Sequence, residues 1–346
     1  MAVLAIVTSS PPDTEGGHLV IARSLVAAAR ACGHDARLVV TPDNGIGRQI
    51  SSYLANWHTD VSEKAGVQVD QVISLRTPSY AVRHSAHVCW LNHTIREYYD
   101  LWPRYRSALS RRARVREAAR RACVHVVDRW LLTHNVTRVV AQSRTIQERL
   151  AQQLNIPSDV LWPPPPPRAY RCDGYGDYVL AISRLTPLKR LDLLLRAMAE
   201  PAARHVRARI VGEGVSGPAL KKLARSLEIA DRVTFLGRID DDALLSHLGE
   251  CRAVCFTPFD EDYGFVTAEA FASGKGVITC RDSGGPTELV RDGETGFVCE
   301  PTPGAVAGAL ARLTDDRALA ERIGAAAAAQ ASAMTWPAAV DRLVIV

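Results

Sequence analysis

The chain of 346 residues is too long for one ordinary hydrophobic core and has the length of two α/β domains. Apolar residues make up 47% of it and charged residues 23%, which is typical of a globular protein and excludes a disordered chain. The formal net charge of +5 is modest, and no stretch of the sequence approaches the roughly 20 continuous apolar residues of a membrane-spanning helix.

The amino-terminal run Ala2–Val7 is short, lacks a basic lead-in and is followed by a Thr-Ser-Ser-Pro-Pro segment. These features predict a first β-strand rather than a signal peptide or a membrane anchor. The eight cysteines are dispersed, with no CxxC pair and no Cys/His spacing typical of zinc. We therefore expect free, mostly buried thiols, no metal site and a cytoplasmic location.

Short β-branched runs alternate with amphipathic stretches of 10 to 15 residues along the first half of the chain. This alternation predicts a parallel sheet covered by helices. The strands expected in this half are Val3–Val7, Arg37–Val40, Val72–Ser74, His87–Leu91, Arg138–Ala141 and Val160–Trp162.

The segment Arg104–Arg129 is predicted to be one arginine-rich helix, with nine arginines against two acids, Glu117 and Asp128. Its charged face is either solvated, or in contact with an anionic membrane surface, or in contact with an anionic acceptor. Nucleic acid is not an expected partner, because neither interleaved aromatic residues nor a known binding module accompanies the charge. The aromatic cluster Tyr98–Trp102 either lines an acceptor site or forms the packed base of this helix.

Five consecutive prolines, Pro163–Pro167, cannot form a helix or a central strand, because proline fixes φ and lacks an N–H group. This stiff spacer predicts a domain boundary between residues 1–165 and 168–333. Helices are expected at Leu191–Ala199 and Pro218–Leu227, and the alanine-rich tail Ala305–Ala333 is expected to be helical. The strands expected in this half are Tyr178–Ile182, Ala208–Val211, Val233–Phe235, Ala253–Phe256, Gly276–Thr279 and Gly296–Val298.

The two alternating halves predict two Rossmann-like, doubly wound domains that face each other across a cleft. Open sheets of this kind bind ligands at the carboxyl ends of their strands.

The strongest chemical signal is the segment Glu261–Glu269, which follows the strand expected at Ala253–Phe256. Gly264 permits close backbone approach and opens a helix, whose free N–H groups and positive end suit a diphosphate. Glu269 falls about one turn into that helix, where a carboxylate can accept hydrogen bonds from ribose hydroxyls. Two glutamates eight residues apart also occur together on ordinary surface helices.

Glu261 and Glu269 together resemble the Glu-x7-Glu motif of the retaining glycosyltransferases of family 4, which have the GT-B fold. Further segments resemble other motifs of that family in the same order: Gly16-Gly17-His18, Gly33-His34-Asp35, Arg184–Asp192, Ile210–Gly214, Val233–Gly237 and Ser283–Glu288. A dehydrogenase is disfavoured, because the first loop, Ser9–Gly17, contains no GxGxxG pattern.

The resemblance implies how a nucleotide-sugar donor would be held. Arg184 and Lys189 would bind the diphosphate and stabilise it as it leaves, in place of a metal ion. Glu269 would take the ribose. Glu261 would contact hydroxyls of the transferred sugar, close to the backbone amides of Gly264, Phe265 and Val266.

The resemblance also implies roles outside this segment. Gly16 and Gly17 would approach the diphosphate or the donor sugar through their backbone. His93 follows the strand His87–Leu91, and the corresponding histidine of the family contacts the donor sugar; a structural histidine is the alternative. The base would rest near Arg238 and Ile239. The last helix, within 334–346, would cross back to the first domain.

We therefore expect a retaining, metal-independent transferase that moves a hexose from a UDP-sugar, or from GDP-mannose, to an acceptor held by the first domain. The acceptor is a glycan, a lipid-linked molecule or a small natural product, and no cofactor is expected. The alternatives are a sugar-nucleotide epimerase or phosphorylase of the same fold, and a non-catalytic partner subunit. The enzyme would be cytoplasmic, and peripheral at the inner face of the membrane only if Arg104–Arg129 contacts the membrane, which is one of the three alternatives for that helix.

Overall fold

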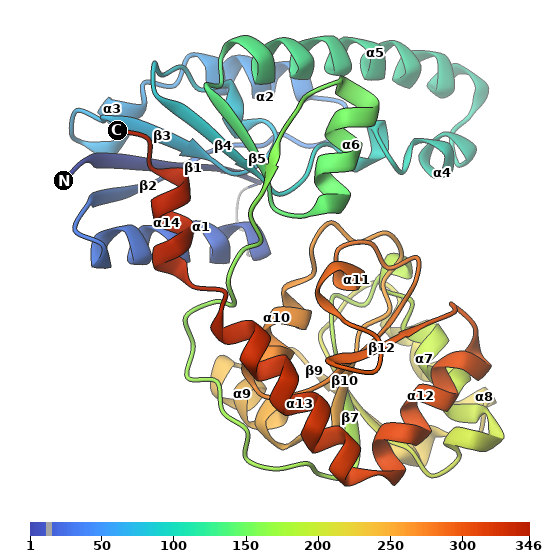
Figure 1. The fold of residues 1–346 in the computed structure, drawn as a ribbon. Helices are drawn as coiled ribbons and strands as arrows, with labels where there is room; N and C mark the ends of the chain where they lie inside the picture. The colour runs from blue at the N-terminus through green and yellow to red at the C-terminus, as the bar shows by residue number, and fades with distance from the viewer. Residues whose placement is uncertain (12–15) are drawn as a thin grey trace. The chain divides into compact units, whose positions relative to one another are not determined.

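The computed structural model describes residues 1–11 and 16–346, which form two compact units (Figure 1). Unit 1 comprises residues 1–166 and 335–346, and unit 2 comprises residues 167–334. The chain leaves unit 1 within the proline run Pro163–Pro167, which forms neither helix nor strand. Residues 12–15, which belong to the loop expected between Ser9 and Gly17, lie outside the described residues.

The sheet of unit 1 has six parallel strands in the order β2-β1-β3-β4-β5-β6. They are β1 (Val3–Ser10), β2 (Asp35–Pro42), β3 (Gln71–Ser74), β4 (His87–Leu91), β5 (Arg138–Ala141) and β6 (Asp159–Val160). The chain winds from β1 to β2 in one direction and from β3 to β6 in the other, so the strand order reverses between β1 and β3. Ligands of doubly wound sheets bind at such a reversal, beyond the carboxyl ends of the strands.

The helices of unit 1 cover both faces of this sheet. They are α1 (Gly17–Ala31), α2 (Gln49–Trp57), α3 (Val61–Ala65), α4 (Trp102–Ser107), α5 (Arg111–His134), α6 (Arg144–Leu154) and α14 (Trp336–Leu343). The last of these returns to the first unit and packs beside α1 (Figure 1). Several hydrogen bonds fix it, among them Trp336 Nε1 to Pro165 O at 2.9 Å and Gln71 Nε2 to Leu343 O at 2.7 Å.

The arginine-rich segment expected as one helix is two helices, α4 and α5, because Ser110 begins a new one. Its hydroxyl accepts a hydrogen bond from the N–H of Ala113 at 3.4 Å and thereby caps α5. The aromatic cluster before these helices is a packed base. Tyr98 Oη donates to Glu117 Oε2 at 2.6 Å, and Tyr99 Oη donates to Asp128 Oδ2 at 2.7 Å.

The sheet of unit 2 also has six parallel strands, in the order β12-β11-β10-β7-β8-β9. They are β7 (Tyr178–Ile182), β8 (Arg207–Val211), β9 (Val233–Gly237), β10 (Ala253–Cys255), β11 (Val277–Cys280) and β12 (Gly296–Cys299). This order is that of the Rossmann fold, and it reverses between β7 and β10. The sheet of unit 1 differs, because its third strand, β3, lies between β1 and β4 and not beyond β2.

The helices of unit 2 are α7 (Leu191–Ala199), α8 (Gly217–Ser226), α9 (Asp241–Glu250), α10 (Phe265–Ala272), α11 (Pro286–Leu289), α12 (Pro303–Asp315) and α13 (Arg317–Ser332). The alanine-rich tail therefore contains two helices. Asp316 separates them, because its carboxylate accepts from the N–H of Leu319 at 2.8 Å and caps α13. Helices α7 and α12 pack together, as do α10 and α13, over an apolar core.

Every strand expected from the sequence is present, with ends shifted by up to a few residues. The cysteines are free but less buried than expected, since Cys32, Cys123 and Cys172 are exposed. Among the described residues, no helix has both the length and the apolar character needed to cross a membrane.

Candidate active site

The loops that leave β7 and β10 lie at the strand reversal of unit 2, and they carry most of the residues singled out from the sequence. β7 pairs with β8 on one side and with β10 on the other. The loop after β7 carries Arg184 and Lys189, and the loop after β10 carries Glu261. The topology of the sheet therefore brings together residues about 70 positions apart in the sequence.

Arg190 fixes the relative positions of these loops. Its guanidinium binds both carboxylate oxygens of Asp282, each at 2.7 Å. The same group donates to Thr257 O at 2.8 Å and to Pro258 O at 2.7 Å. One planar cation with a fixed fork of donors thus joins the loops that follow β7, β10 and β11.

The loop after β10 is also held by its backbone. Phe259 N donates to Leu188 O at 2.7 Å, and Glu261 N donates to Ser283 O at 2.9 Å. Gly284, at φ +68°, makes this contact possible, because a Cβ atom there would lie 2.5 Å from Glu261 O. Glu261 is therefore placed by its neighbours on both sides and not by its own loop alone.

Lys189 and Glu261 form an ion pair, with 2.5 Å between Nζ and Oε2. Both side chains are mostly buried, at 13% and 18% exposed. The family resemblance assigned them to neighbouring parts of one ligand, and the structure brings them into direct contact. A ligand with a negative group beside several hydroxyls can bind both, the anion at the ammonium and the hydroxyls at the carboxylate.

Arg184 is the other cation expected at this position, and it is exposed. Its side chain has no hydrogen bond or ion pair with any residue that the structure describes. The backbone at this point is nevertheless closely packed, since a Cβ atom on Gly212 would lie 1.9 Å from Ser183 O. Arg184 is thus a long cation on a fixed backbone, available to an anionic ligand.

Gly264, at φ +79°, is the N-cap of α10, and Phe265 and Val266 form its first turn. A Cβ atom on Gly264 would lie 2.6 Å from Phe256 Cε1, so this position requires glycine. The first N–H groups of a helix have no partner within it and point along the axis. These amides belong to the segment that directly follows Glu261.

Glu269 is buried in the second turn of α10, at 6% exposed. Its Oε1 accepts a hydrogen bond from Arg168 Nη1 and one at 3.3 Å from Tyr170 Oη. Burial raises the pKa of this carboxyl, and the positive charge of Arg168 opposes that rise. Arg168 also pairs with Asp241 Oδ1 at 3.0 Å, so it links the start of unit 2 to α9 and α10.

The sequence analysis did not identify Arg168, Tyr170, Arg190 or Asp282. Arg168 and Tyr170 follow the proline run, which marks only a boundary. Arg190 lies within the segment Arg184–Asp192 but was given no role there. Its position one residue after Lys189 was a weak signal that it belongs to the site. Arg238 and Ile239 follow β9 at the edge of the sheet, and no hydrogen bond or ion pair within residues 1–11 and 16–346 joins them to Lys189, Glu261 or Glu269.

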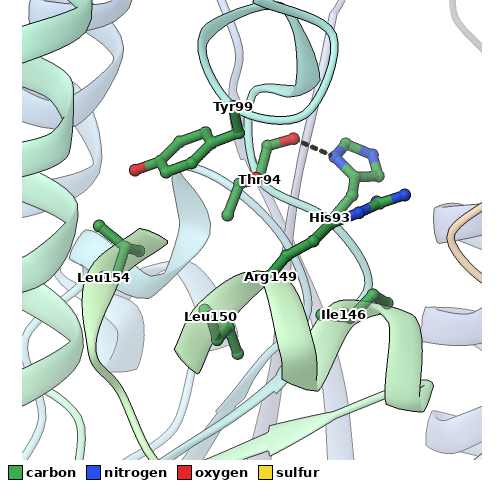
Figure 2. Close-up of a pocket in the computed structure, with 7 residues that line it drawn as sticks. All are labelled: His93, Thr94, Tyr99, Ile146, Arg149, Leu150 and Leu154. Atoms are coloured by element: carbon green, nitrogen blue, oxygen red, sulfur yellow. Dashed lines mark hydrogen bonds between the residues drawn. The ribbon is translucent and has the colours of Figure 1, made fainter. Parts of the chain in front are cut away.

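Gly16, Gly17 and His93 belong to unit 1. Gly16 is the N-cap of α1, and a Cβ atom there would lie 3.0 Å from His18 Nδ1. His93 follows β4, and its Nδ1 donates to Thr94 O at 2.9 Å. His93 lines a small hollow at α6 (Figure 2), together with Thr94, Tyr99, Ile146, Arg149, Leu150 and Leu154.

No group of three or more His, Cys, Asp or Glu side chains within residues 1–11 and 16–346 is arranged to hold a metal ion.

Residues 170–330 match the family described as Glycosyl transferases group 1. A D-inositol 3-phosphate glycosyltransferase of Streptomyces griseus is 37% identical over 174 residues, which are 47% of this chain and 37% of the relative. The chain thus spans little more than a third of the length of the curated relatives it matches.

Solved structures resemble nearly the whole chain. The sucrose-phosphate synthase of Thermosynechococcus elongatus has a TM-score of 0.74 and 18% identity, covering 98% of this chain and 96% of that one. Anabaena HepE in complex with UDP-glucose has a TM-score of 0.68 and 18% identity, covering 98% of both chains. At this identity the likeness shows the fold, and two Rossmann-like units of this kind form the GT-B fold.

Replacing Arg190 by alanine should lower the free energy of unfolding of unit 2 by about 2 kcal/mol, because Asp282 and two carbonyls lose a charged partner. Denaturant unfolding measures this change. Arg291→Ala is the matched control, because Arg291 makes an exposed pair with Glu294 three residues away, which contributes little. Equal unfolding curves for the two variants would contradict the role given to Arg190.

Proposed function

We propose that this protein is a glycosyltransferase that moves a sugar from a nucleotide-diphosphate donor to an acceptor hydroxyl. The observation that carries the proposal is the Lys189–Glu261 pair at the strand reversal of unit 2, with Glu269 in the helix that follows. The match of residues 170–330 to Glycosyl transferases group 1 covers the same part of the chain.

In the proposed complex, the donor lies beyond the carboxyl ends of β7 and β10. Lys189 and Arg184 bind the diphosphate, and the first amides of α10 add further donors to its oxygens. Glu269 accepts hydrogen bonds from the ribose. Glu261, released from Lys189 by the incoming phosphate, accepts hydrogen bonds from hydroxyls of the transferred sugar.

The proposed reaction retains the anomeric configuration. The bond between the anomeric carbon and the phosphate oxygen breaks, and the acceptor oxygen bonds to the same face of that carbon. The acceptor proton passes to the departing phosphate. The diphosphate gains one negative charge as its bond to the anomeric carbon breaks and loses it again when it takes the proton, and the ammonium of Lys189 and the guanidinium of Arg184 stabilise that developing charge. The fixed loops contribute by positioning the reacting groups.

We propose a UDP-sugar as the donor, with GDP-mannose second, and no metal or other cofactor. The solved structure of HepE with UDP-glucose supports the uridine nucleotide. The acceptor is a glycan, a lipid-linked molecule or a small natural product that binds to unit 1, with His93 beside the transferred sugar. The protein is cytoplasmic in this proposal.

A thermal-shift panel of UDP, GDP, ADP and their sugars, with and without a chelator, tests the donor class, because a ligand of the folded state raises the melting temperature. A shift with uridine nucleotides that the chelator leaves unchanged is the expected result. Hydrolysis or transfer of the sugar then separates a transferase from a non-catalytic partner subunit. Isomerisation of the donor without loss of the nucleotide would identify an epimerase instead.

Glu269→Gln should weaken UDP binding about tenfold, because the ribose loses a charged acceptor while the shape is kept. Calorimetry with UDP and 2′-deoxy-UDP isolates the contact: the parent should prefer UDP, and the variant should bind the two alike. Glu294→Gln, on an exposed turn, serves as the control. If Glu269→Gln prefers UDP over 2′-deoxy-UDP as strongly as the parent does, Glu269 does not bind the ribose.

We also propose that the exposed faces of α4 and α5 contact an anionic membrane. Arg104, Arg106, Arg111, Arg112 and Arg129 are exposed and form no ion pair in the part of the chain that the structure describes. Three apolar side chains on α5 are exposed beside them: Val115 at 74%, Val126 at 70% and Trp130 at 48%. Exposed cations beside apolar side chains are typical of helices that lie at a bilayer surface.

Arg111→Gln with Arg112→Gln should lower binding to phosphatidylglycerol vesicles about thirtyfold, since each basic residue contributes about 1 kcal/mol near such a surface. Vesicle co-sedimentation at rising salt measures this binding, which should weaken as salt screens the charges. Arg204→Gln with Arg225→Gln removes the same charge from exposed sites of unit 2 and should have no effect. Equal binding to uncharged phosphatidylcholine vesicles would contradict the proposal.

A further inference from the structure

A second group of polar side chains lies at the strand reversal of unit 1, between β1 and β3. Arg76 follows β3, Asp43 follows β2, and Asn92 follows β4. The N–H of Asn92 donates to Leu75 O at 2.8 Å, which places Asn92 beside Arg76 on the adjacent strand. All three residues are thus at the edge of the sheet where doubly wound folds bind ligands.

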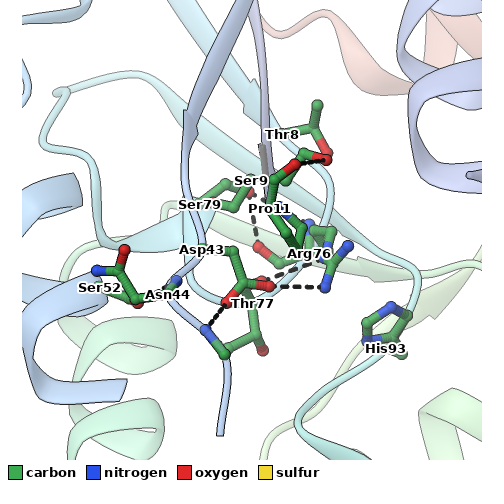
Figure 3. A network of polar contacts seen from close by, with 12 residues as sticks. Thr8, Ser9, Pro11, Asp43, Asn44, Ser52, Arg76, Thr77, Ser79 and His93 are labelled. Atoms are coloured by element: carbon green, nitrogen blue, oxygen red, sulfur yellow. Dashed lines mark hydrogen bonds and ion pairs between the residues drawn. The ribbon is translucent and has the colours of Figure 1, made fainter. Parts of the chain in front are cut away.

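Arg76 and Asp43 form a largely buried ion pair (Figure 3). Arg76 Nη2 lies 3.0 Å from Asp43 Oδ2, and the two side chains are 14% and 19% exposed. Arg76 Nε also donates to Thr77 O at 3.3 Å, and Asp43 Oδ1 accepts from Gly45 N at 3.0 Å. Such pairs add little to stability, because desolvation offsets their attraction. Stability alone therefore does not account for a buried pair at this position.

Several polar atoms at this edge of the sheet have no hydrogen-bond partner within the residues that the structure describes. A guanidinium has five N–H donors, and the remaining ones of Arg76 have no partner among residues 1–11 and 16–346. Asn92 is 8% exposed and its Oδ1 has no hydrogen-bond partner. Thr8 Oγ1, at the end of β1, is likewise buried and without a partner. Buried polar groups are normally satisfied, so these atoms point to a ligand.

The unused groups include donors and acceptors at the same edge of the sheet, and this mixture selects the ligand. A hydroxyl both donates and accepts, so adjacent hydroxyls can bridge the guanidinium of Arg76, the carboxylate of Asp43 and the amide oxygen of Asn92. A phosphate has only acceptor oxygens when ionised, and it would meet the carboxylate of Asp43 with a like charge. The site therefore favours an uncharged, hydroxyl-rich molecule.

We propose that Arg76, Asp43 and Asn92 form the acceptor site, and that the acceptor is an uncharged sugar or polyol. This inference rests on the proposed transfer reaction and specifies its acceptor. Figure 3 shows His93 at the same edge of the sheet, one residue after Asn92. The proposed acceptor site thus lies next to His93 within unit 1.

The test uses the nucleotide sugar selected by the thermal-shift panel and pairs of acceptors that differ by one phosphate. The pairs are glucose and glucose 6-phosphate, N-acetylglucosamine and its 6-phosphate, and myo-inositol and its 1-phosphate. Release of the nucleotide and the mass of the product report transfer. At least one uncharged member should be used with kcat/KM ten times or more above its phosphate. Preference for the phosphates, or transfer to no member by an enzyme that binds the donor, overturns the proposal.

Asp43→Asn, which keeps the shape of the side chain, and Arg76→Gln should raise the KM for the acceptor at least tenfold and leave the Kd for the nucleotide unchanged. The matched controls are Asp35→Asn and Arg37→Gln, because these residues form a 2.8 Å pair at the opposite end of β2. An unchanged acceptor KM in Asp43→Asn would also overturn the proposal.

Ligand-observed NMR of the same sugars on the nucleotide-free protein reads the acceptor site independently of transfer. Sugar binding that Asp43→Asn abolishes, in a protein that binds no nucleotide, would refute the transfer reaction and keep this site. If the protein binds nucleotide and transfers the sugar normally, and Asp43→Asn has no effect, the acceptor site is refuted and the transfer reaction is kept.

Discussion

The guanidinium of Arg190 is the constraint on which the site of unit 2 depends. The loops after β7, β10 and β11 are far apart in the sequence, and this one side chain binds Asp282 and the carbonyls of Thr257 and Pro258. A planar cation with fixed donors holds such loops more exactly than a flexible ammonium could. The adjacent residue, Lys189, is thereby positioned against Glu261.

In the Lys189–Glu261 pair the ammonium and the carboxylate neutralise each other. In the proposed complex, each of them binds a different part of the donor. Each charge is partly buried, so each needs a partner until a ligand supplies one. A diphosphate can replace the carboxylate at the ammonium, and sugar hydroxyls can replace the ammonium at the carboxylate. Glu269 is likewise paired within the protein, because Arg168 and Tyr170 both donate hydrogen bonds to its carboxylate. In the proposed function, both glutamates exchange these protein partners for hydroxyls of the donor.

The sequence was sufficient to predict the strands and the strand-reversal residues, because β-branched runs, proline and glycine act locally. Glu261, Gly264 and Glu269 could be singled out because they lie in one segment that resembles a family motif, and their roles stay predictions. The partners of these residues could not be singled out, since Arg168 is 101 positions from Glu269 and nothing near either residue indicates the other. The break between α4 and α5 was missed because a single serine cap outweighed a continuous helical pattern. Arg76 and Asp43 belong to no motif, and only the topology of the sheet makes them neighbours.

The central claim is that the ammonium of Lys189 binds the diphosphate. Calorimetric titration of the parent and of Lys189→Ala with UDP, UMP and uridine tests it most directly. If the protein binds guanine nucleotides instead, GDP, GMP and guanosine replace them. Lys221→Ala, on the exposed face of α8, is the control. If the ammonium holds the diphosphate, Lys189→Ala should lose at least tenfold in affinity for UDP, less for UMP and nothing for uridine. Equal affinity of the parent and Lys189→Ala for UDP would contradict the account.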